Sequence, residues 1–275
     1  MNPHRNILTA LVLTVLLAGS ALPSVAQEYK EAFNAGLEAA KDPNSFATAR
    51  DKFAQAVEGA VEASDNDVAQ RARYYAAQID YKMGNTAFKA EDFESALTHY
   101  SSGAEIYPAY VKNLYGQGLA LKKLGRMDEA LEAWTKVTAD TRDRRTALAA
   151  LSAIRDHFYY QASSAVSKRA VVAADADRAL TALSELTNYI ETPDADYYYY
   201  TAVAHQIKGA FAESLTAADQ ALELHNGSRT DKAKIYFVKG EVLVALGNTD
   251  AAKTAFQNAA FGSYKPSAEH YLETL

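Results

Sequence analysis

The chain has 275 residues, of which 49% are hydrophobic and 23% are charged, and its formal net charge is −6. A chain of this length and composition can bury a hydrophobic core. The acidic balance argues against nucleic acid and anionic membranes as main partners, because both are polyanions. Cysteine is absent, which excludes disulfides, thiolate metal sites and a cysteine nucleophile.

Residues 1–26 are predicted to be a secretory signal peptide. His4 and Arg5 precede an apolar run over residues 7–18, which is short for a membrane span. Ser24 and Ala26 then supply small residues before a cleavage site at Gln27. We therefore expect an exported protein, periplasmic or secreted, without stable membrane insertion after cleavage. An uncleaved membrane anchor is the alternative.

The rest of the chain, residues 27–275, has the hydrophobic periodicity of helices. Apolar residues recur at i, i+3, i+4 and i+7 between short turn clusters, and no alternating strand pattern of useful length is present. Two segments, 77–110 and 111–144, repeat with a period of 34, so that Gly84 aligns with Gly118 and Tyr100 with Trp134. Such a period is typical of an array of helix–turn–helix units.

Extending this register predicts an all-α solenoid of about six antiparallel helical hairpins in one domain. The clear repeats are 77–110, 111–144, 195–228 and 233–266, whereas 29–63 and 145–191 are divergent. In the divergent hairpin 145–191, we expect helices over 146–168 and 176–190, and a break at Pro193 with Asp194 capping the next helix. A last helix over 266–275 is expected to cover the end of the array.

Small residues occupy equivalent helix positions in several repeats. A glycine inside a helix costs roughly 1 kcal/mol relative to alanine, so Gly84, Gly118 and Gly240 require a reason. Close approach of the second helix of each hairpin provides one, and an aromatic residue in that helix is expected to fill the gap between repeats. The aromatic residues concerned are Tyr100, Trp134 and Phe256.

With these residues the chain resembles the tetratricopeptide repeat (TPR) family over most of 29–262. The sequence departs from the family pattern at Asp80, where a large residue is usual, at Glu91, where glycine usually ends the turn, and at Val137, where alanine is usual. The resemblance implies a concave groove that binds a protein or peptide. It also implies that the fifth position of each first helix faces that groove.

The residues at that position are all aromatic: Phe33, Tyr81, Tyr115, Tyr199 and Phe237. Tyrosine offers a flat apolar ring and a hydroxyl, which suits the binding of peptides or sugars; packing alone is the competing interpretation. Asn85 matches one position of the family's carboxylate clamp, but Tyr81 and Gly116 replace other clamp residues, so we reject a clamp. The candidate partner-binding residues are Phe33, Tyr81, Asn85, Tyr115, Lys122, Tyr199 and Phe237.

Two further surface features stand out. The run Tyr197–Tyr200 points around a whole helix turn, so only some of its rings are expected in the core and the others at the surface. A basic cluster is formed by Lys122, Lys123, Arg126, Arg142, Arg144 and Arg145. It either receives an acidic partner segment or consists of solvated helix ends, where cations near a C-terminus are favourable.

No constellation of catalytic, cofactor-binding or metal-binding residues is recognisable. The histidines are isolated, and no glycine-rich phosphate loop or serine nucleophile motif occurs. The sequence therefore predicts a non-enzymatic, exported scaffold that needs no cofactor and binds a protein or peptide in its groove, in a setting such as cell-envelope assembly. A glycan-binding protein with a tyrosine-lined groove is the alternative, and the oligomeric state is not specified.

The register can be tested by overpacking. Ala96→Leu or Ala130→Leu adds bulk where two helices are expected to touch, and each should lower the free energy of unfolding by roughly 1–3 kcal/mol. Denaturant melts of both variants measure this cost. Unchanged stability in both would show that the register is wrong.

Overall fold

The structure of the chain is a computed structural model that describes residues 25–140, 142–167 and 170–275. Throughout these ranges the regular secondary structure is helical, which confirms the predicted all-α class. The predicted signal peptide lies outside the described residues except for Val25 and Ala26. These two residues begin the first helix, α1. The chain divides into two compact units, 1–79 and 80–275, with the division inside helix α3.

The first unit contains the predicted hairpin 29–63. Its helices are α1 (Val25–Ala39), the short 3-10 helix η1 (Pro43–Ser45), α2 (Phe46–Glu62) and the start of α3 (Asn66–Lys89). Phe53 is completely buried, and a Cβ atom on Gly36 would lie 2.8 Å from its ring. The hairpin is therefore closed by an aromatic ring lying on a glycine, although its sequence is divergent.

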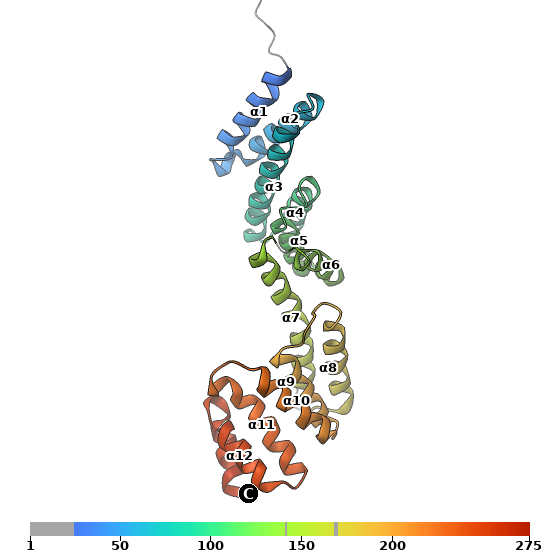
Figure 1. Cartoon of the computed structure of the whole chain (residues 1–275), viewed down its shortest axis with the longest axis vertical. Coiled ribbons are helices and arrows are strands. Elements are labelled where there is room, and N and C mark those ends of the chain that lie inside the picture. Colours follow the sequence, from blue (N-terminus) through green and yellow to red (C-terminus); the bar gives the residue numbers. More distant parts are fainter. Residues whose placement is uncertain (1–24, 141, 168–169) are drawn as a thin grey trace, which may run out of the picture. The chain divides into compact units, whose positions relative to one another are not determined.

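The second unit begins with the rest of α3 and continues as a series of antiparallel hairpins, each packed on the next (Figure 1). Its further helices are α4 (Phe93–Ile106), α5 (Lys112–Lys123), α6 (Met127–Thr138), α7 (Arg144–Val166), α8 (Ala173–Leu186), α9 (Ala195–Ile207), α10 (Phe211–Leu224), α11 (Arg229–Ala245), α12 (Thr249–Ala259), the 3-10 helix η2 (Gly262–Tyr264) and α13 (Lys265–Thr274).

In this unit the aromatic rings lie directly on the glycines of the first helices, a contact that the sequence pattern did not specify. A Cβ atom on Gly84 would lie 2.5 Å from the ring of Tyr100, and one on Gly118 would lie 2.3 Å from Nε1 of Trp134. Tyr100 also lies on Gly116 of the following hairpin, where a Cβ atom would approach its ring to 2.6 Å. Only glycine leaves room for a ring this close to the helix backbone, so these positions set the spacing between the helices.

The fifth hairpin, α9 and α10, lacks this aromatic wedge. Ala202 takes the glycine position and Ala218 the aromatic one, and both are completely buried. Ser214, also completely buried, donates a hydrogen bond of 2.7 Å to the carbonyl of Ala202. Two small residues and a hydroxyl bonded to the backbone thus join the helices where other hairpins use a ring.

The departures from the family pattern are accommodated locally. Glu91 adopts a left-handed φ of 61°, the same region as Gly125 at the equivalent turn, where φ is 77°. A non-glycine residue in this region is strained by about 1–2 kcal/mol. Asp80 is buried, with 2% of its surface exposed, and its Oδ2 accepts a hydrogen bond of 3.0 Å from the Ser102 hydroxyl.

The hairpin in 145–191 is regular but differs in composition. Helices α7 and α8 begin slightly earlier than the ranges predicted from the sequence. The large buried ring in this hairpin belongs to the first helix, as Phe158. The second helix contributes Ala176, Ala179 and Leu183, all at most 1% exposed. Because the ring stands on the first helix, no glycine is required there.

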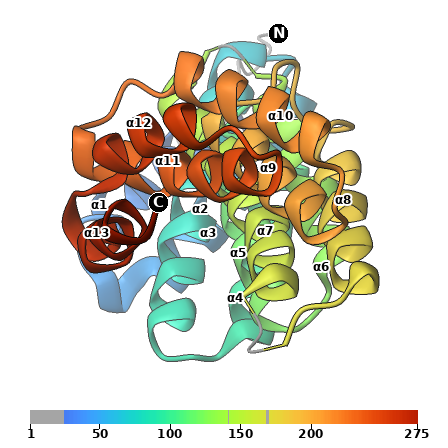
Figure 2. The same cartoon turned by 90° about the horizontal axis from the view of Figure 1, so that it is seen from below.

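The predicted C-terminal capping helix is confirmed as α13, which lies beside α11 and α12 (Figure 2). Ala268 is completely buried. The ring of Tyr271 stacks on that of Phe256 with centroids 4.3 Å apart and an interplanar angle of 5°. The capping helix therefore covers the aromatic ring that closes the last hairpin.

Replacing a wedge glycine should destabilise the second unit. Gly118→Ala improves helix propensity, but its Cβ must displace the indole of Trp134. We expect a net loss of about 1–3 kcal/mol in the free energy of unfolding. Trp134 is the only tryptophan and its Nε1 donates to the Tyr115 carbonyl at 3.2 Å, so its fluorescence reports the displacement. Thr98→Ala, on the exposed face of α4, is the control that should leave stability nearly unchanged.

Candidate functional site

The predicted partner-binding residue of the first unit, Phe33, lies in an aromatic cluster. Only 5% of its surface is exposed, and its ring meets Phe53 at 5.9 Å and Tyr75 at 5.8 Å between centroids. The guanidinium of Arg71 lies 5.0 Å from the Phe33 ring centroid. Phe33 therefore contributes mainly to packing inside its own unit.

At the start of the second unit, the structure brings Tyr81 and Asn85 together around Tyr100. The ring of Tyr81 is partly exposed and lies 6.0 Å from that of Tyr100 and 5.8 Å from that of Tyr110. The Tyr100 hydroxyl donates to Oδ1 of Asn85 at 2.7 Å. Burial, followed by the nearby Tyr81, raises the pKa of Tyr100. The Asn85 amide is thus oriented by a neutral hydroxyl from the hairpin core.

Tyr115 and Lys122 lie two turns apart on the same face of α5. Tyr115 is partly exposed, and its pKa is raised by burial, then by Tyr81 and by Asp156 of α7. Lys122 is exposed and belongs to the last turn of α5. Burial lowers the pKa of His157, and Lys122 lowers it further. Both candidates on α5 are therefore near side chains of α7.

Tyr199 of α9 and Phe237 of α11 come together through a residue that the sequence did not single out, Tyr264 of η2. Burial raises the pKa of Tyr199, and the hydroxyl of Tyr264 contributes to the shift. The rings of Phe237 and Tyr264 are 5.3 Å apart. Lys234 Nζ lies 4.5 Å from the Tyr199 ring centroid, which is a cation–π contact.

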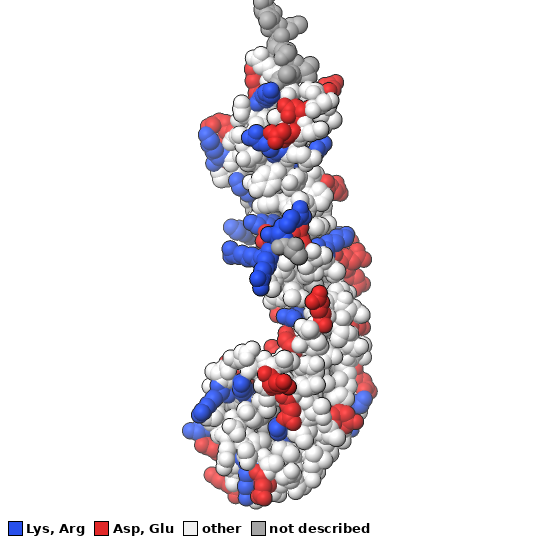
Figure 3. Space-filling view, viewed as in Figure 1, with Lys and Arg blue, Asp and Glu red and all other residues white. Residues whose placement is uncertain are grey.

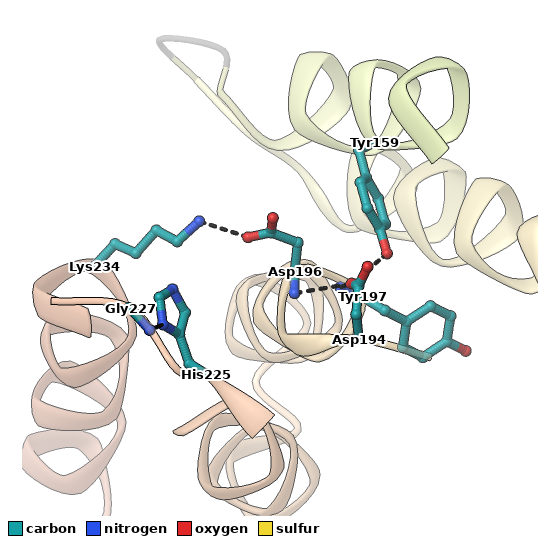
Figure 4. A network of polar contacts seen from close by, with 7 residues as sticks. All are labelled: Tyr159, Asp194, Asp196, Tyr197, His225, Gly227 and Lys234. Carbon is teal, nitrogen blue, oxygen red and sulfur yellow. Dashed lines mark hydrogen bonds and ion pairs between the residues drawn. The ribbon is translucent and has the colours of Figure 1, made fainter. Parts of the chain in front are cut away.

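The same Lys234 ammonium forms an ion pair of 2.7 Å with Asp196 at the start of α9 (Figure 4). These two residues occupy equivalent positions of consecutive repeats, because Asp196 and Lys234 have the same offset as Tyr199 and Phe237. Opposite charges at equivalent positions of adjacent first helices were therefore a usable signal. A comparison of the small and aromatic positions alone does not detect this pair.

Asp194 confirms its predicted role as N-cap of α9. Its Oδ1 accepts hydrogen bonds from the backbone N–H groups of Asp196 and Tyr197. The Tyr159 hydroxyl of α7 also donates to this oxygen at 2.5 Å (Figure 4). Burial and the bond to Asp194 raise the pKa of Tyr159. Asp194 thus caps α9 and also links the start of α9 to α7 through the hydrogen bond from Tyr159.

The run Tyr197–Tyr200 does not divide into buried and fully exposed rings. All four residues are partly exposed, and each packs against at least one hydrophobic cluster of the second unit. Helix α9 contacts α7, α8, α10 and α11. Because neighbours surround it on several sides, every one of these tyrosines finds an apolar partner and remains partly exposed.

The described residues contain no group of three or more histidine, aspartate or glutamate side chains placed to hold a metal ion. In the same ranges, no helix is both long and apolar enough to span a membrane. The residues of the predicted basic cluster stand on several elements, and two of them, Arg126 and Arg142, pair with Glu129 and Asp140. Lys122 and Lys123 end α5, whereas Arg144 and Arg145 begin α7.

No protein-family profile matches the sequence, and no curated protein matches it significantly. Solved structures with similar features include a tetratricopeptide repeat protein from Parabacteroides merdae, 14% identical over 90% of this chain and 98% of that one, with a TM-score of 0.34. Another is YrrB, a TPR protein with an unusual peptide-binding site, 18% identical over 72% of this chain and 91% of that one, with a TM-score of 0.37. At TM-scores this low, the similarities carry no weight for the function of this chain.

The double role of Asp194 can be measured by a mutant cycle. Asp194→Ala removes a helix cap and leaves the Tyr159 hydroxyl without its acceptor, which should cost roughly 2–4 kcal/mol of unfolding free energy. Tyr159→Phe should cost about 1–3 kcal/mol. If the contact joins α7 to α9, the double variant should be less destabilised than the sum by about 0.5–3 kcal/mol. Strict additivity in urea melts would contradict this.

Proposed function

We propose that the chain is an exported, non-enzymatic repeat scaffold that binds a protein or peptide. The observation that carries the proposal is the set of partly exposed aromatic residues at one repeat position of the second unit. Tyr81, Tyr115, Tyr199 and Phe237 stand on the first helices of four hairpins, and each packs against a hydrophobic cluster while remaining partly exposed. Repetition of one chemical group at the hairpin spacing suits an extended chain that crosses several hairpins.

The chemistry at these positions favours a peptide. Polar side chains stand near two of these positions. The Asn85 amide, one turn along α3 from Tyr81, accepts a hydrogen bond from the buried Tyr100, and the Lys234 ammonium lies over the ring of Tyr199. A peptide backbone offers both donors and acceptors to such groups, and its side chains can pack on the rings. Export follows from the predicted signal peptide, and an assembly role in the cell envelope would place the partner there.

Hydroxyl removal tests this proposal without removing the packing of the rings. The triple variant Tyr81→Phe, Tyr115→Phe, Tyr199→Phe keeps every ring but loses three hydroxyls. We expect capture of the partner from a cell-envelope extract to fall roughly tenfold or more, because each lost hydrogen bond is worth about 0.5–1.5 kcal/mol. Quantitative mass spectrometry of the captured proteins measures the change.

Tyr160→Phe is the matched control, because this residue is 73% exposed and lies outside the aromatic set. It should capture the partner as the parent protein does. Equal capture by the triple variant would contradict a role for the tyrosine hydroxyls. Binding on a glycan array that the triple variant loses, without any captured protein, would favour the glycan-binding alternative. Fractionation of cells that express the tagged full chain tests export.

A further inference from the structure

A small pocket lies where α6 ends and α7 begins, away from the aromatic positions. It has a volume of about 290 Å³ and is lined by Thr138, Asp140, Arg144, Ala147, Leu148 and Leu151. Leu148 is a large apolar residue, yet 54% of its surface is exposed. The pocket therefore presents an apolar wall with an arginine beside it, and its volume suits a side chain more than a whole small molecule.

The two carboxylates nearest this pocket in the sequence, Asp140 and Asp143, have partners other than Arg144 and Arg145. Arg142 pairs with Asp140, and the Asp143 carboxylate caps α7 by accepting from the backbone and the hydroxyl of Thr146. Arg144 and Arg145 are exposed. In the part of the chain that the structure describes, neither has a carboxylate at ion-pair distance. Figure 3 shows Lys and Arg side chains gathered near the start of α7.

These two arginines also stand at the unfavourable end of their helix. The first turn of a helix favours acids and disfavours cations, and α6 and α9 carry acids there, but α7 carries none. The interpretation of the basic cluster as favourable C-terminal helix ends therefore fails for Arg144 and Arg145. It holds for Lys122 and Lys123 in the last turn of α5. The stability of α7 does not explain why arginines stand here.

We propose that this pocket, with Arg144 and Arg145, binds a linear acidic segment of a protein partner. The inference rests on the proposed function, since it assumes a protein partner. The formal charge of −6 opposes the approach of long polyanions such as nucleic acid or an anionic membrane. A short acidic segment can pair with two arginines without meeting the acidic remainder of the surface.

The distance between Arg144 and the apolar wall at Leu148 defines the sequence of the bound segment further. Arg144 and Leu148 are one helical turn apart on the same face of α7, about 6 Å along the axis. In an extended peptide, side chains two residues apart point the same way and are separated by about 6.6 Å. The segment should therefore have a large apolar residue that enters the pocket and an aspartate or glutamate two positions away. Further acids can reach Arg145.

A phage-displayed library of random peptides, selected on the purified protein, tests this directly. We expect enrichment of peptides with an acid two residues from a large apolar side chain. Synthetic fluorescein-labelled versions should bind at least tenfold more weakly to the double variant Arg144→Gln, Arg145→Gln. Replacing the acid of the peptide by its amide should weaken binding similarly. The affinity should also fall as salt is raised.

The matched control is the double variant Lys122→Gln, Lys123→Gln, which loses the same charge at the end of α5. It should bind the peptides as the parent does. The lysine variant should melt at a lower temperature than the parent, because the helix dipole favours the lysines at the end of α5. It does not favour the arginines at the start of α7. We expect the arginine variant to melt no lower than the parent. A lower melting temperature in that variant would indicate a structural role for the arginines.

The outcomes separate this inference from the proposed function. Enriched peptides without the acidic pattern, or with an affinity unaffected by the arginine variant, would overturn the inference and leave peptide binding intact. A selection that enriches no peptide would count against both. Leu148→Gln provides a second check, because it should weaken the labelled peptides while changing the stability of this exposed position little.

Discussion

An aromatic side chain on the second helix of a hairpin lies against a glycine of the first helix, and the spacing of the two helices depends on this contact. Tyr100, Trp134 and Phe256 are at most 2% exposed, and each approaches a glycine more closely than any Cβ would permit. Burial of such a ring stabilises the fold by roughly 1.5–3 kcal/mol. Tyr100 lies on glycines of two successive hairpins, so one ring joins a hairpin to its neighbour.

Where this contact is missing, polar side chains take over part of its role. The fifth hairpin replaces the ring by Ala218 and adds the buried hydrogen bond of Ser214. The start of the same hairpin is held by Asp194, which bonds Tyr159 of α7. A hydrogen bond depends on direction, whereas the burial of apolar surface does not. Specific polar pairs therefore define this part of the second unit, and the fit of buried side chains defines the regular repeats.

Surface chemistry follows from the same arrangement. The aromatic residue at the fifth position of a first helix packs beside the core and remains partly exposed, as Tyr81 and Tyr199 do. Because the hairpins repeat, a partly exposed aromatic residue recurs along the surface at the hairpin spacing. Arg144 and Arg145 have a different origin. The dipole of α7 does not stabilise cations at its start, and the two charges remain available to an anionic group.

Period and composition by themselves determined the helices, the hairpin register and the glycines at which two helices approach closely. The helices depend on residues a few positions apart, which the 3.6-residue periodicity records in the sequence. The register depends on the 34-residue period, which repeats one hairpin along the chain. The tertiary structure alone decided which candidate side chains meet. Tyr199 reaches Tyr264, and Tyr115 lies near Asp156, only because successive hairpins stack with particular offsets. Those offsets result from the packing of many side chains at once, and no local pattern encodes them.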